Sequence, residues 1–512
     1  MVFATVLLMS GCTDVIVGWE RDRKASTPPA SSDRADETAV AEGTETTRAG
    51  GRHGSGDAAQ PRGTAGSTGD PETTSATTGV RGLTWTAEEL AVWRKRSRNG
   101  PYRTKGDAGR NTPGDWQRIT ENAAEFAQSP AASQLVAGFD GCASQRNLGI
   151  DKPFGRDTRG AGGKFEHSVE LRDAAFVALV ENDAVLARMV IDQLLRQARE
   201  PTMDFTNSGK WCPVETNVVA FETNEFLFPL SSYLARLLFA YDYVARSASP
   251  AERATLDRWH RDAAAYIRNG VYRSDRLWKD AEAGDYTPTQ GPSYRYPQWR
   301  GGRDTSRYGR HYNNRQATTV LYLTAVGVHL GDDALKRLGR RWAQEYLRYS
   351  VYPDGTVAEL ERGRADAERG MNYVNKTLST VAMIADLLAR YGDLSVYDYT
   401  TSEGIFGTTG GPKSLRSTMR AVDTMYDSSG RIATGGGDYG ATDTKLGSDA
   451  AFAVAQRYYD DPVIGRLLTR AWPARPRHSW AEPWQGPWGL LPGALFQYHS
   501  LPAAAGDPYR SG

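Results

Sequence analysis

The sequence predicts an all-α fold built from antiparallel helical hairpins, and three observations support this class. From Leu83 onward, apolar residues recur with the helical period of about 3.6 residues. Strand alternation is scarce, and no Asn-Gly or Asp-Gly pair lies between two alternating runs. The connecting segments carry Gly, Pro and aromatic residues. For a chain of 512 residues, an incomplete or closed toroid of hairpins suits the length better than a four-helix bundle.

The N-terminal segment predicts export. Residues 1–11 resemble the end of a bacterial lipoprotein signal, in which Cys12 would carry the lipid. Residues 12–82 are rich in Ser, Thr, Gly and Pro and almost lack large apolar residues, which predicts a disordered tether. We therefore expect a cell-surface protein that meets the membrane only through this lipid, with residues 83–512 forming one helical domain.

Capping signals and apolar stripes place the helices in order. Capping boxes at Thr86–Glu89 and Ser249–Glu252 each open a helix, and Asn182-Asp183 separates two helical stripes. The clearest stripes are Leu227, Leu230, Leu234, Leu237, Tyr241 and Val244; Leu256, Trp259, Ala263 and Ile267; Leu335, Leu338, Trp342, Tyr346 and Tyr349; and Leu378, Val381, Ala385 and Leu388.

Charge and cysteine content exclude several classes of protein. The chain has 62 basic and 61 acidic residues, a balance that argues against a nucleic-acid binder. No stretch approaches the roughly 20 apolar residues of a membrane span. Cys142 and Cys212 allow either a disulfide or two buried thiols, and neither has metal-ligand spacing. We expect no metal, no organic cofactor and a monomer.

One segment stands out in this neutral chain as cationic and aromatic. Residues 293–315 hold six Arg and five aromatic residues against one acid, Asp304. Aromatic rings stack on sugar faces, and guanidinium groups bind carboxylates, so an acidic polysaccharide is the expected partner. A solvated loop and a single-stranded nucleic-acid surface are the alternatives. The candidate substrate-binding residues are Arg315, Asn313, Tyr312, Arg310, Tyr308, Trp299 and Tyr296, with Trp211 from an earlier loop.

Four short motifs follow one another from this segment onward. They are His311-Tyr-Asn-Asn-Arg315, Tyr352-Pro-Asp-Gly355, Glu359-Leu-Glu-Arg362 and Met371-Asn-Tyr-Val-Asn375, the last leading into a predicted helix over 377–391. Their order and spacing resemble the alginate-lyase family, which has an (α/α) toroid fold. The similarity is best over about Tyr308–Tyr391.

The resemblance implies cleavage of uronic-acid glycosides by β-elimination. Asn314 would then neutralise the uronate carboxylate with help from Arg362, and Tyr373 would act as base, acid or both. Arg315 stands where the family has His, and a guanidinium group is a poor base. His311 is the alternative base; otherwise Tyr373 acts alone, which favours syn elimination.

Each of these residues also has a purely structural interpretation. Asn313 with Gln316 forms a helix N-cap pair, Tyr373 could pack at a helix start, and Arg362 could pair with nearby acids. His311 could be an ordinary loop residue. Two alternative functions remain open: a glycoside hydrolase, which needs two opposed carboxylates, and a glycan-binding lipoprotein without catalysis.

Overall fold

The computed structural model describes residues 82–99, 115–135, 164–206, 220–283, 312–357, 367–404, 407–425 and 449–469. By its internal contacts the chain divides into Met1–Thr74 and Ser75–Gly512, and every described residue belongs to the second unit. The predicted signal, the tether and all three cysteines lie outside the described residues. Those expectations stay predictions.

Helices dominate the described part of the chain, and the strands found there form a single antiparallel pair, so the all-α class is confirmed. The α-helices are α1 (Ala87–Asn99), α2 (Asp115–Gln128), α4 (Lys164–Glu181), α5 (Ala184–Ala198), α6 (Ala220–Val244), α7 (Pro250–Ala283), α9 (Asn314–Leu330), α10 (Asp333–Tyr349), α11 (Ala367–Ala389), α12 (Leu415–Met425), α13 (Asp449–Tyr459) and α14 (Pro462–Thr469). Short 3-10 helices cover Pro130–Ser133, Pro201–Met203 and Ala245–Ser247, and the strands are β1 (Thr400–Gly404) and β2 (Gly407–Ser414).

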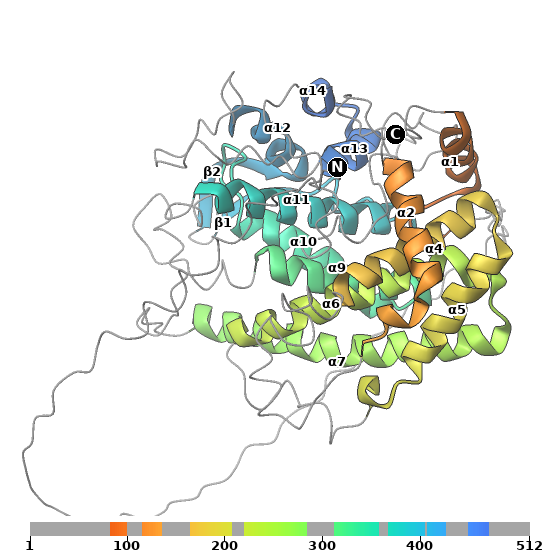
Figure 1. Ribbon diagram of the computed structural model, residues 1–512. Helices are drawn as coiled ribbons and strands as arrows, with labels where there is room; N and C mark the ends of the chain where they lie inside the picture. Colours follow the sequence, from red (N-terminus) through yellow and green to blue (C-terminus); the bar gives the residue numbers. More distant parts are fainter. Residues whose placement is uncertain are drawn as a thin grey trace, which may run out of the picture. The chain divides into compact units, whose positions relative to one another are not determined.

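The helices form an inner and an outer series (Figure 1). Inner helices α2, α4, α6, α9, α11 and α13 each contact the next, while α5, α7 and α10 pack outside them. Burial separates the two series: the side chains of residues 230–244 of α6, 316–328 of α9 and 377–389 of α11 are all buried. The outer helices bury only one face. This arrangement confirms the helical hairpins; closure of the series into a toroid stays a prediction.

Two-residue turns make the hairpins antiparallel. Asn182 adopts a φ of 59°, and the Asp183 side chain then caps α5 by accepting the Leu186 amide at 2.9 Å. Gly331, with a φ of 71°, ends α9, and Asp332 caps α10. Turns this short return the chain alongside the helix that it has just left.

Both predicted capping boxes are confirmed. In α1 the Thr86 amide donates to the Glu89 carboxylate at 2.8 Å, and the Glu89 amide donates to the Thr86 hydroxyl at 3.3 Å. In α7 the same pair of bonds joins Ser249 and Glu252 at 2.8 and 3.3 Å. The local sequence therefore fixes where these helices begin.

Helix α1 and the residues before it lie across the C-terminal ends of inner helices. The Leu83 amide and the Trp85 indole N–H both donate to Asp242 near the end of α6, at 2.9 and 3.0 Å. Arg94 donates to two carbonyl groups, those of residues 179 and 180, near the end of α4. The C-terminal ends of α4 and α6 therefore meet at α1.

Glu89 joins the same helix to the C-terminal part of the chain. Its carboxylate pairs with both terminal nitrogens of Arg390, just after α11, each at 2.9 Å, and with Arg457 of α13 at 2.6 Å. Arg390 also bonds Asp386 at 2.7 Å. Burial raises the pKa of Glu89, but the two guanidinium groups outweigh that effect, so its net pKa lies below the ordinary value.

A buried polar contact joins α7 to α9. The His260 ring nitrogen Nδ1 lies 3.1 Å from the Tyr322 hydroxyl, and both side chains are fully buried. Burial, with a smaller contribution from nearby His329, lowers the pKa of His260 to about 3. His260 is therefore neutral at physiological pH. Near the end of α9, the His329 ring lies 5.0 Å from that of Tyr241, so this helix also ends beside the end of α6.

Two elements differ from the sequence prediction. The β1–β2 hairpin was not predicted, because its Thr- and Gly-rich strands lack apolar alternation and carry a register shift between Thr401 and Glu403. Helix α11 begins at Ala367 rather than at 377, because Gly370 and Asn372 weaken its local helical signal without stopping the helix. Tyr373 therefore lies inside α11 and not at a helix start.

Candidate functional site

Helix directions bring the predicted motifs to one end of the inner series. The chain turns back after α11 at Gly392, which has a φ of 87°. The segment that follows runs alongside α10 in the same direction, since Arg340 pairs with Asp393 at 3.1 Å and Gln344 donates to the Ser395 carbonyl at 3.1 Å. Helices α10 and α11 are therefore antiparallel. Helix α9 is antiparallel to α10 through their tight turn. The N-terminal ends of α9 and α11 therefore share one end with the C-terminal end of α10, opposite α1.

Tyr373 is level with Asn314 along the helix axes. Leu388 and Asp333 line the same pocket at the α1 end. From Leu388 back to Tyr373 is about 15 residues, or roughly 22 Å, and from Asp333 to Tyr349 is about 16 residues, or roughly 24 Å. The backbone of Tyr373 thus reaches the level where α10 ends and α9 begins. The side chain of Tyr373 lies outside the described residues.

The Asn-Asn pair has two distinct placements. Asn313 is the N-cap of α9, and its side-chain oxygen accepts from the amides of Arg315 and Gln316 at 2.9 and 3.0 Å. This confirms the structural interpretation of Asn313. Asn314 is the first residue of α9, with 5% of its surface exposed, and Arg315 is half-buried beside it. A helix start with an amide and a guanidinium group is suited to hold a carboxylate.

Tyr312 is a core residue, which corrects the expectation that it stacks on a sugar. Its ring has no exposed surface and lies 5.9 Å from the Trp342 ring and 5.5 Å from the Tyr349 ring. Its hydroxyl donates to Glu345 at 2.9 Å. The ring offers no open face to a ligand, and it anchors the entry to α9 on α10 instead.

Gln316, which the sequence indicates only as the N-cap partner of Asn313, has a buried side chain. It is 0% exposed, and within the described ranges neither atom of its side-chain amide has a hydrogen-bond partner. A buried amide without partners is uncommon in native proteins. The sequence signal was its position in the first turn of α9, three residues after the Asn313 cap.

The Tyr352–Gly355 motif forms a turn that is fixed against α12. The Asp354 carboxylate accepts from the amide and hydroxyl of Thr356 at 3.0 and 2.6 Å. Gly355 has a φ of 83°, and a Cβ atom there would lie 2.6 Å from the Ser417 carbonyl oxygen. Only glycine fits this close approach, so α12 sets where the turn lies.

Two helix N-termini and a buried lysine lie at this end of the helices. Helix N-termini carry partial positive charge, and α9 and α11 both begin here. Lys413 of β2 is fully buried and donates to the Arg348 carbonyl at the end of α10. Burial, with a smaller contribution from Arg348, lowers the pKa of Lys413 to about 8. The lysine neutralises the negative end of α10 next to the Tyr352–Gly355 turn.

Several predicted site residues cannot be placed. They lie outside the described residues: His311, Arg310, Tyr308, Trp299, Tyr296, Trp211 and Arg362. Helix α6 follows Trp211 in the sequence, and its C-terminal end meets α1. The N-terminal end of α6 therefore lies at the same end of the inner helices as the N-terminal end of α9. Across the described part of the chain, no three His, Cys, Asp or Glu residues gather as metal ligands, and no helix is long and apolar enough to cross a membrane.

Comparison with known proteins identifies the segment that holds these motifs. Residues 294–405 match the alginate lyase family model. The alginate-lyase match begins within the cationic segment and continues through α9, α10 and α11 into β1. No curated protein matches the chain. At the level of the family, the match indicates a polysaccharide lyase and a polysaccharide substrate, for part of the chain.

Proposed function

We propose that this protein cleaves an acidic, uronic-acid-containing polysaccharide by β-elimination at the end of the inner helices where α9 and α11 begin. The observation that carries the proposal is the alginate-lyase match over residues 294–405, whose Asn-Asn and Tyr motifs lie on helices that begin at one end. The protein is further proposed to be exported and anchored by a lipid on Cys12.

The reaction requires three roles around one sugar ring: a donor that neutralises the carboxylate, a base for the C5 proton and an acid for the O4 oxygen. The C5 proton becomes acidic enough to remove only when the adjacent carboxylate is neutralised. Asn314 supplies an amide donor at the start of α9, where the partial charge of the helix also favours an anion. Arg315 is the guanidinium group next to it, and Arg362 is assigned the same task by the family resemblance.

Tyr373 is the proposed proton carrier. In its phenolate form, which nearby positive charge favours, it removes the C5 proton; the electron pair of that bond forms the C4–C5 double bond, and the C4–O4 bond breaks. The same phenol then donates a proton to the departing O4 oxygen. His311 is the alternative base. Arg315 stays protonated at working pH and takes no part in the proton transfer.

Substitution of Tyr373 by Phe tests this assignment. We expect Tyr373→Phe to reduce product formation at least about a hundredfold, since general acid–base groups contribute about 10²–10⁴-fold, while polymer binding persists. The assay follows ultraviolet absorbance of the unsaturated product during digestion of a panel of acidic polysaccharides. Tyr266→Phe, on the outer helix α7, is the matched control.

Other outcomes would point to other functions. Full activity in Tyr373→Phe would remove this residue from the mechanism. New reducing ends without ultraviolet absorbance would indicate a glycoside hydrolase, and binding without either signal would indicate a glycan-binding protein.

A further inference from the structure

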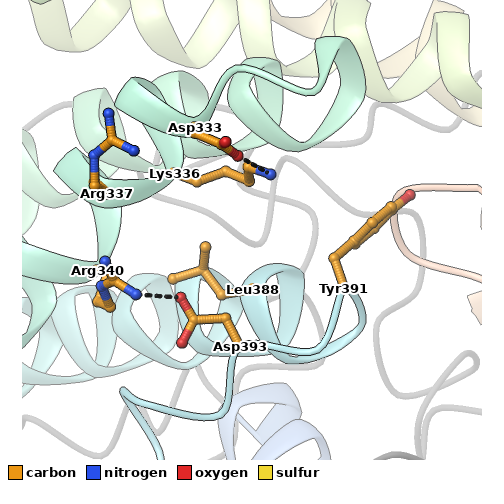
Figure 2. Close-up of a pocket in the computed structure, with 7 residues that line it drawn as sticks. All are labelled: Asp333, Lys336, Arg337, Arg340, Leu388, Tyr391 and Asp393. Atoms are coloured by element: carbon orange, nitrogen blue, oxygen red, sulfur yellow. Dashed lines mark hydrogen bonds and ion pairs between the residues drawn. The ribbon is translucent and has the colours of Figure 1, made fainter. Parts of the chain in front are cut away.

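A cationic pocket lies at the end of the helices opposite the proposed reaction site. It has a volume of about 240 Å³ and lies between the first half of α10 and the end of α11 (Figure 2). This is below the 300–1,000 Å³ of sites for larger ligands, so it suits about one sugar ring. Its lining residues are Asp333, Lys336, Arg337, Arg340, Leu388, Tyr391 and Asp393.

The pocket carries a net positive charge. Asp333 pairs with Lys336 at 2.6 Å, and Asp393 pairs with Arg340 at 3.1 Å. The third cation, Arg337, is exposed; it acts electrostatically on Asp333 one turn earlier, whose ion pair is with Lys336. The two ion pairs are partly exposed, and such pairs are worth about 0–1 kcal/mol, so a ligand carboxylate can compete for their cations.

An aromatic ring lines the pocket on the side away from Arg337 and Arg340. Tyr391 is 38% exposed, which is unusual for a large hydrophobic side chain among the described residues, and its hydroxyl donates to the Gly82 carbonyl at 3.4 Å. Figure 2 shows the ring at one side of the pocket, with Leu388 between it and Arg340. A ring and a leucine provide an apolar wall, whereas simple anion sites need only charges and amides.

We propose that this pocket binds the acidic polysaccharide, with Arg337 on a uronosyl carboxylate at one side and Tyr391 against a sugar face at the other. The inference rests on the proposed function for the identity of the polymer. From Arg337 to Tyr349 is about 12 residues, so the pocket lies roughly 18 Å along the helix axis from the reaction site. One ring cannot reach both places, and the pocket holds a separate stretch of polymer near the enzyme.

Affinity electrophoresis of the full chain through gels containing alginate tests the proposal at low ionic strength. We expect Arg337→Glu and Tyr391→Ala each to weaken retardation about fivefold, the size of one lost charged or aromatic contact. Arg258→Glu on α7 makes the same change in net charge from another exposed arginine, and Tyr391→Phe keeps the ring. Both controls should migrate like the wild-type protein.

Three results would overturn the proposal. Equal weakening by Arg337→Glu and Arg258→Glu would reduce the effect to overall charge. Unchanged retardation in Tyr391→Ala would remove the ring from binding. If inorganic phosphate and free uronate displace the polymer equally at the same ionic strength, the pocket binds anions in general and does not recognise the sugar.

Turnover measurements separate this inference from the proposed function. With the polymer as substrate, Arg337→Glu should raise KM about fivefold and leave kcat unchanged. With short oligosaccharides, KM and kcat of Arg337→Glu should both equal those of the wild-type protein. Absence of unsaturated product from every substrate would refute the lyase while leaving the electrophoresis result valid for the pocket. An unchanged KM on the polymer in Arg337→Glu would refute the pocket while leaving the lyase intact.

Discussion

Replacing Glu89 by Gln should destabilise the whole helical array, because this one carboxylate joins α1 to two later elements. Its oxygens lie 2.9 Å from both terminal nitrogens of Arg390 and 2.6 Å from Arg457, and the Glu89 side chain is 6% exposed. Breaking a buried ion pair by removing one partner costs about 3–5 kcal/mol. Arg390 keeps its bond to Asp386, so we expect the lower part of that range, about 3 kcal/mol.

Thermal and denaturant unfolding give the test. Unfolding entropy of about 2.1 cal/mol/K per residue, over roughly 440 residues, converts 3 kcal/mol to a decrease in Tm of about 3 °C. Glu88→Gln is the matched control, since Glu88 is the exposed neighbour on the same helix. The pKa of Glu89 is lowered in the folded state, so its contribution is present above the unfolded pKa and is lost as pH falls through the folded pKa. The reasoning fails if Glu89→Gln and Glu88→Gln unfold at the same denaturant concentration.

Two further substitutions probe the turn and the buried histidine. Gly355→Ala should cost more than about 2 kcal/mol, because alanine adds left-handed strain of about 1–2 kcal/mol and its Cβ meets Ser417. Gly392→Ala, with a φ of 87° and open space around it, should show the strain alone, and equal costs at both positions in urea unfolding would contradict the clash. The pKa of His260 is about 3 when folded and near 6.5 when unfolded, so the unfolded state binds the proton first as pH falls below 6.5. Stability should therefore decrease by about 1.4 kcal/mol per pH unit from that group, and His260→Phe should remove this slope; an unchanged slope between pH 6 and 4 would show that His260 does not titrate in this way.

Local patterns predicted the helices well where a cap or a turn is encoded in a few residues. The capping boxes at Thr86 and Ser249 both occur as predicted, because each depends on bonds within four residues. The start of α11 and the β1–β2 hairpin were missed. Their residues have weak local preferences, and packing against α9, α10 and α12 decides their conformation.

The candidate site was predictable as a set of motifs and not as an arrangement. The order of the Asn-Asn, Pro-Asp-Gly and Tyr motifs predicted the family resemblance that the comparison supports over residues 294–405. The same pattern did not show that Tyr312 is buried between α10 aromatics. The sequence shows that residue 312 is a tyrosine, but the burial of its ring depends on the direction in which α10 runs past it.

The sequence by itself determined the helical period, the caps and the chemistry of the residues at the start of α9, since these follow from bonds between near neighbours. Only the tertiary structure decided which helix ends meet. Glu89 and Arg390 are 301 positions apart in the chain, and their pairing depends on every intervening hairpin turn. That pairing helps to hold α1 over one end of the inner helices, which leaves the starts of α9 and α11 together at the other end. A helical pattern repeats every few residues, so it carries no information about a contact between residues 301 positions apart.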